Sequence, residues 1–67
     1  MIQEQVGRRI KELRYVLGIS QEELAARADV HRSYIASLEV GKRNVSIVNL
    51  EKISKALEAS LSDFFKF

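Results

Sequence analysis

Apolar residues recur along the chain at intervals of three or four, a spacing that predicts α-helices. In residues 2–17 they form one stripe within about a quarter of the helix circumference, at Ile2, Val6, Ile10, Leu13 and Leu17. Gly7 interrupts this stretch and would permit the close approach of another helix. Strand-like alternation is absent and the sequence has no proline, so we expect an all-α fold with one domain over residues 1–67.

Capping signals divide the rest of the chain. Ser20 precedes Glu23 by the three residues of a capping box, and Ser46 and Ser60 are further N-cap candidates. Gly41 fits a left-handed helix end. The second and third predicted helices span about 21–28 and about 31–40. The fourth starts after Ser46 and has its inner face over 50–57, and the fifth spans 61 to about 66.

The predicted helix over 31–40 has two unlike faces. At about 100° per residue, Ile35 and Leu38 fall on one side and suit a core. The other side carries a guanidinium, two hydroxyls and a small side chain, from Arg32, Ser33, Ala36 and Ser37. The planar guanidinium can donate two parallel hydrogen bonds to guanine, and the small residues can meet base edges. The pattern therefore predicts a helix that reads bases in the DNA major groove.

Net charge alone says little about the function, since 11 basic and 9 acidic side chains give a value of only +2. A charged face is also typical of any solvated surface. A chain of 67 residues without cysteine has a thin margin of stability, which dimerisation would increase. Ile47 and Val48 lie off the inner face of their predicted helix, and Phe65 and Phe67 are left over after the core positions are assigned. These four apolar residues form the predicted dimer interface. The alternative for Phe65 is that it completes the core.

Nearly the whole chain resembles the phage repressor and Cro-type (XRE-like) family. The matching segments are residues 9–14, 17–25, 34–39 with Gly41, 50–57 and 61–65. The resemblance implies a five-helix, lambda-repressor-like DNA-binding domain whose second and third helices form the helix-turn-helix. It also implies core positions at Leu61 and Phe64. Within the family, residues 31–35 and 41–46 are most similar to controller proteins of restriction–modification systems.

This resemblance implies a sequence-specific transcriptional regulator that binds a near-palindromic double-stranded DNA operator as a homodimer. The alternatives are a phage-type repressor and an antitoxin-like protein-interaction module with the same fold. Fold alone does not decide between them, but Arg32, Arg43 and Asn44 favour DNA over a protein partner.

The resemblance also assigns roles to individual residues. It implies an ion pair between Arg14 and Glu39 and places the loop after the third helix beside the DNA backbone. Gln21 lies at a helix N-terminus, which suits a phosphate; the alternative is an ordinary solvent-exposed glutamine. His31 is either a turn residue or a phosphate contact. The expected DNA-backbone contacts are Gln21, His31, Tyr34, Lys42, Arg43 and Asn44.

Other classes of function find little support in the sequence. It contains no metal-ligand cluster, no pairing of nucleophile and base, and no glycine-rich phosphate loop, so we expect no catalytic residue, metal or cofactor. Without a long apolar run or a signal peptide, we expect a cytoplasmic protein that does not enter membranes. Glu22 and Glu23 favour the dipole of their own helix, or they contact RNA polymerase as part of an activator.

Overall fold

The computed structural model describes residues 1–66, so Phe67 lies outside the described residues. These residues form five helices and no strand, as predicted. The helices are α1 (Ile2–Leu17), α2 (Gln21–Ala28), α3 (Arg32–Glu39), α4 (Ile47–Ala56) and α5 (Leu61–Phe64). The prediction made the third helix one residue too long at each end and the fifth about two residues too long.

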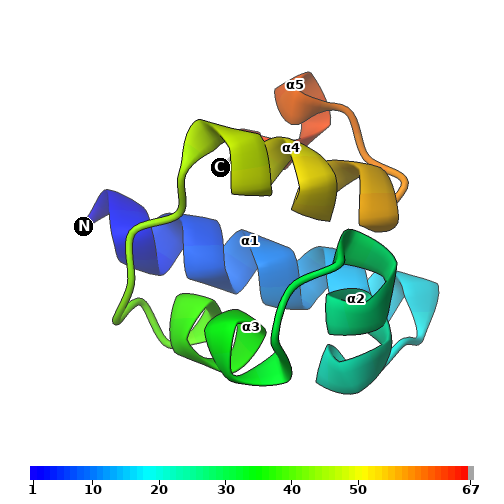
Figure 1. Ribbon diagram of the computed structural model, residues 1–67. Helices are drawn as coiled ribbons and strands as arrows, with labels where there is room; N and C mark the ends of the chain where they lie inside the picture. Colours follow the sequence, from blue (N-terminus) through cyan, green and yellow to red (C-terminus); the bar gives the residue numbers. More distant parts are fainter. Residues whose placement is uncertain (67) are drawn as a thin grey trace.

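In the view of Figure 1, α1 runs across the middle of the picture, with α4 and α5 drawn above it and α2 and α3 below it. It packs against α3 and α5, while α2 packs against both α3 and α4. Gly7 makes the approach to α3 possible. A Cβ atom at this position would collide with the carbonyl oxygen of Leu38 and would lie 3.1 Å from the carbonyl carbon of Glu39.

Three serines cap helices, as their spacing predicted. The hydroxyls of Ser20, Ser46 and Ser60 accept hydrogen bonds of 3.0 to 3.1 Å from backbone N–H groups three residues ahead. Each satisfies one of the backbone donors that a helix leaves unpaired at its start. The carboxylate of Glu23, expected to complete a capping box, accepts a hydrogen bond of 2.9 Å from Arg27.

The core is built from the apolar faces of all five helices. Its largest fully buried side chains are Ile10, Leu24, Ile35, Leu38, Ile53 and Phe64. Two expected core residues are exposed: Ile2 by 55% and Leu61 by 37%. Each is the first residue of its helix, where the chain enters from solvent, and the buried stripe starts further along the helix.

Candidate nucleic-acid interface

α3 is held from behind and presents its other face outward. Ile35 and Leu38 are buried, whereas Arg32 and Ser33 are exposed. Ala36 and Ser37 are half-buried, and the Ser37 hydroxyl donates a 2.9 Å hydrogen bond to the Tyr34 carbonyl. The hydroxyl oxygen of Ser37 can still accept hydrogen bonds. The outward side of α3 therefore combines a guanidinium with small side chains that leave room for a duplex.

The turn before α3 sets the direction of the helix. Asp29 has a left-handed backbone with φ of 57°, a conformation that Asp tolerates better than most residues. Val30 packs against the core and so closes the turn on its inner side. His31 is the exposed N-cap of α3, in an extended conformation and without a side-chain capping bond. This placement agrees with a turn residue and leaves its imidazole on the surface.

A buried polar cluster anchors the far end of α3. The Glu39 carboxylate accepts hydrogen bonds from Arg14 Nε at 2.8 Å, Arg14 Nη2 at 3.0 Å and Gln21 Nε2 at 3.1 Å. The Arg14 and Glu39 side chains are only 9% and 3% exposed. Arg14 Nη1 also donates to the Ile19 carbonyl at 2.9 Å. We call Arg14, Gln21 and Glu39 the clamp, because it joins α1, the start of α2 and the end of α3.

The hydrogen bonds of the clamp set the pKa of Arg14 and the position of Gln21. The hydrogen bonding of Arg14 to the Glu39 carboxylate raises the pKa of Arg14, against the opposing effect of burial. Gln21 is half-buried and bonded to Glu39, so it is not an ordinary exposed glutamine. Its amide group has a second hydrogen, and its position at the N-terminus of α2 is compatible with the predicted phosphate contact.

The loop after α3 begins with Gly41, whose φ of 75° ends the helix in the left-handed conformation that was predicted. Backbone bonds of 3.0 Å from Gly41 and Lys42 return to the Leu38 and Ser37 carbonyls, the pattern of a Schellman cap. Lys42, Arg43 and Asn44 follow and are all exposed. The structure thus brings these three predicted contacts next to the end of α3.

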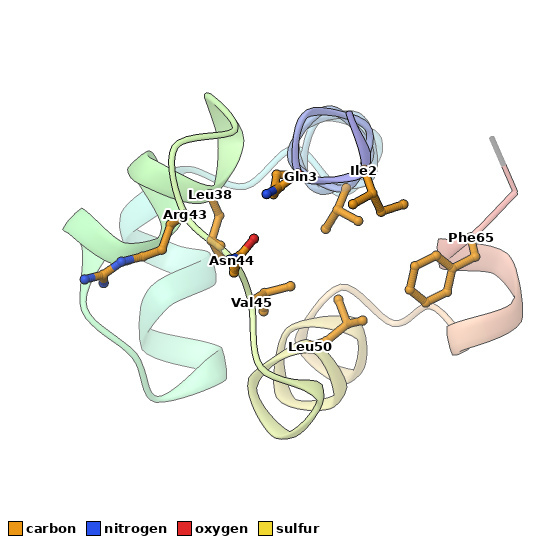
Figure 2. A pocket seen from close by; sticks show the side chains of 9 residues that line it. Ile2, Gln3, Leu38, Arg43, Asn44, Val45, Leu50 and Phe65 are labelled. Atoms are coloured by element: carbon orange, nitrogen blue, oxygen red, sulfur yellow. The ribbon is translucent and has the colours of Figure 1, made fainter.

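A cleft of about 290 Å³ opens beside α1. Figure 2 shows its apolar side chains grouped between α1, α4 and Phe65, with Arg43 extending away from them. Gln3, Arg43 and Asn44 also line it, next to the apolar residues Ile2, Val6, Leu38, Val45, Leu50 and Phe65.

The residues of the predicted dimer interface are exposed as far as the structure describes them. Ile47 and Val48 are exposed in the first turn of α4, and Phe65 is 44% exposed. Phe65 meets the ring of buried Phe64 edge-on, with 5.7 Å between ring centroids. The alternative that Phe65 completes the core is wrong, because this residue is too exposed to belong to the core. The fourth predicted residue, Phe67, lies outside the described residues.

Asn49 was not predicted as a site residue, yet its side chain reaches the predicted interface. Its Nδ2 donates a 3.2 Å hydrogen bond to the Tyr34 hydroxyl. Its position in the first turn of α4 gives no signal of this contact, because the two residues are 15 positions apart.

Within residues 1–66, no three His, Cys, Asp or Glu side chains are grouped so as to hold a metal, and no helix is long and apolar enough to span a membrane.

Comparisons with known proteins agree with this geometry. The model of the helix-turn-helix family matches residues 10–64. Control protein C.MunI of Mycoplasma sp is 52% identical over 60 residues, which cover 88% of this chain and 81% of that protein. The crystal structure of the restriction-modification controller protein C.AhdI from Aeromonas hydrophila has a TM-score of 0.91 at 41% identity, covering 94% of this chain and 96% of that one. C.Esp1396I bound to a 25 base pair operator site has a TM-score of 0.91 at 38% identity, covering 98% of this chain and 87% of that one.

Proposed function

The chain belongs to the helix-turn-helix family, and from this membership we propose that it is a sequence-specific transcriptional regulator of double-stranded DNA. The observation that carries the proposal is the two-sided α3. Buried Ile35 and Leu38 fix its back, while Arg32 is exposed on its front. An eight-residue helix anchored in this way can enter a major groove, which is wide enough to admit a helix.

Base reading and backbone contact would belong to different parts of this surface. On α3, Arg32 would recognise guanine, and Ser33, Ala36 and Ser37 would meet neighbouring base edges. Around it, side chains from the helix ends and the loop would contact phosphates and fix the register of the protein on the duplex. These contacts are Gln21, His31, Tyr34, Lys42, Arg43 and Asn44.

We further propose that the chain acts as a homodimer. Ile47, Val48 and Phe65 are exposed apolar residues in a small chain, and their burial would supplement its core. A two-fold dimer would separate its reading helices by about 34–36 Å, one turn of DNA, and would match a near-palindromic operator. Short base-reading side chains make few contacts, so DNA bending and groove shape would supply part of the specificity.

The biological role we propose is that of a controller of a restriction–modification system. The support is that C.MunI, C.AhdI and C.Esp1396I are named as control or controller proteins, and that one of them has been solved on an operator. Such a regulator would act in the cytoplasm on the genes of its own system. If it activates transcription, exposed Glu22 in the first turn of α2 is the candidate contact for RNA polymerase. A Glu22→Ala variant would then bind DNA normally and fail to activate.

Selection of bound duplexes from random DNA tests the proposed function directly, because it yields sequence, symmetry and half-site spacing together. The best duplex is then titrated with variants at two salt concentrations. We expect Arg32→Ala to lose about 1–3 kcal/mol of discrimination at one base pair of each half-site. We expect Arg43→Ala to weaken binding to all sequences alike and to lower the salt slope by about 1.

Lys55→Ala is the matched control, since it removes one positive charge from an exposed position in the last turn of α4. It should leave both the preferred sequence and the affinity nearly unchanged. Recovery of random sequences from the selection would refute the proposed function. A change of preferred base in Arg43→Ala, with an unchanged salt slope, would refute the division between reading and backbone residues.

A further inference from the structure

α4 reaches the proposed DNA surface through two consecutive contacts that join three side chains. Asn49 Nδ2 donates to the Tyr34 hydroxyl at 3.2 Å. The Tyr34 ring lies beneath the guanidinium of Arg43, with 5.3 Å between the guanidinium carbon and the ring centroid. Asn49 and Tyr34 are half-buried, and Arg43 is exposed. The contacts therefore run from α4 through α3 to the loop that follows it.

The three side chains also share one surface hollow. This hollow has a volume of about 430 Å³ and is lined by residues of the turn before α3, α3 itself, the loop and α4. Arg43 and Lys52 bring two positive charges to it, and Asp29 brings one negative charge. The network thus lies where the helix-turn-helix, the loop and α4 meet.

Asn49 is held in place by its helix. It lies in the first turn of α4, and its backbone N–H donates to the capping hydroxyl of Ser46 at 3.1 Å. Arg43, in contrast, belongs to a loop and has a long side chain with many rotamers. The face of an aromatic ring attracts a guanidinium, so the orientation of Tyr34 decides where Arg43 is held.

We propose that Asn49 is a positioning residue for DNA binding, which fixes the Tyr34 ring and thereby holds Arg43 toward the DNA backbone. This inference rests on the proposed function, because it assumes that Arg43 contacts phosphate. Ordering Arg43 before binding removes part of the entropy that would otherwise be lost on the DNA. Asn49 strengthens binding in this way without touching the duplex.

The test is a set of double-mutant cycles on the best selected duplex at one fixed salt concentration. We expect Asn49→Ala and Tyr34→Phe each to weaken binding by about two- to tenfold, the range for loss of one hydrogen bond. The two substitutions together should weaken binding no more than the larger single effect. In an Arg43→Ala background, Asn49→Ala should change the affinity by less than about twofold, because nothing remains for it to position.

Two controls separate positioning from stability. Thermal melting of Asn49→Ala should stay close to that of the wild type, since the backbone cap to Ser46 does not involve its side chain. Tyr15→Phe removes a tyrosine hydroxyl from an exposed position on α1 and should leave DNA affinity unchanged. If Asn49→Ala does not fold, Asn49→Leu, which keeps the side-chain size but lacks the amide donor, carries the same cycle with Arg43→Ala, and independent effects there would overturn the proposal.

Three results would overturn the inference, and only the last of them would also overturn the proposed function. Wild-type affinity in Asn49→Ala overturns the inference and leaves the proposed function intact. An undiminished effect of Asn49→Ala in the Arg43→Ala background also overturns it, because Asn49 would then act on the DNA by itself. A wild-type protein that prefers no DNA sequence would overturn the proposed function and the inference together.

Discussion

Removal of the Glu39 carboxylate should come close to unfolding this protein. Glu39 accepts three hydrogen bonds, two from Arg14 and one from Gln21, and its side chain is 3% exposed. In Glu39→Ala the Arg14 guanidinium would stay in a nearly solvent-free site, bonded to the Ile19 carbonyl but without its counter-charge. Loss of one partner of a buried ion pair costs about 3–5 kcal/mol.

That cost is large compared with the stability available to so short a chain. At roughly 0.05–0.15 kcal/mol per residue, a domain of this size has only about 3–10 kcal/mol in total. Since 1 kcal/mol corresponds to about 4–8 °C in a small domain, we expect the melting temperature of Glu39→Ala to fall by on the order of 20 °C. Circular dichroism melting checks this, at one fixed protein concentration because the proposed dimer would make stability concentration-dependent.

A second variant shows whether the stranded charge is the cause. Replacement of both partners by apolar residues, Arg14→Met with Glu39→Leu, removes the unpaired guanidinium as well as the carboxylate, and such replacements are often neutral or better. The double variant should therefore melt well above Glu39→Ala. A melting temperature of Glu39→Ala within about 2 °C of wild type would refute the reasoning, since a loss of about 3–5 kcal/mol would lower it by much more than that.

Three further predictions test other parts of the structure. Gly7→Ala should destabilise the protein by about 1–3 kcal/mol in thermal melts, although alanine normally favours a helix, because its Cβ would collide with the Leu38 carbonyl. Val48→Glu should convert dimer to monomer in sedimentation experiments, whereas Val16→Glu, at another exposed valine, should not; two dimeric variants would refute the interface. Hydrogen bonds from Lys66 and Ser60 lower the pKa of Asp63 below its usual 3.8. The stabilisation that the ionised Asp63 gives to α5 is therefore fully present above pH 3.8 and is lost as pH falls through the lower pKa of the folded state. An NMR titration measures this pKa directly.

The helices could be predicted from local signals. Ser20, Ser46 and Ser60 cap the helices that follow them, and a cap involves residues only three positions apart. The apolar spacing likewise identified the buried face of α3. The errors lie at helix ends. Ile2 follows the periodic pattern, and Leu61 was expected in the core from the resemblance, but both extend past the core. Periodicity reports the direction of a side chain and does not report where the core stops.

The long-range polar contacts could not be read from spacing. The Arg14–Glu39 pair was expected only because the chain resembles a family, and the bond from Gln21 to Glu39 was not expected at all. Asn49 was overlooked because its partner Tyr34 belongs to another helix. Such bonds depend on the relative placement of helices, which a one-dimensional pattern of apolar positions leaves undetermined.

These long-range contacts all converge on α3, and its length explains why. A helix of eight residues is too short to be stable alone, so packing determines both its existence and its direction. Gly7 sets how closely α1 approaches it, Glu39 ties its last turn to α1 and α2, and Asn49 bonds to Tyr34 on its flank. On the proposed function, the side chains that meet DNA are therefore oriented by residues that do not. Affinity for an operator should respond to Gly7 and Asn49 as well as to Arg32, but only Arg32 should change which base is preferred.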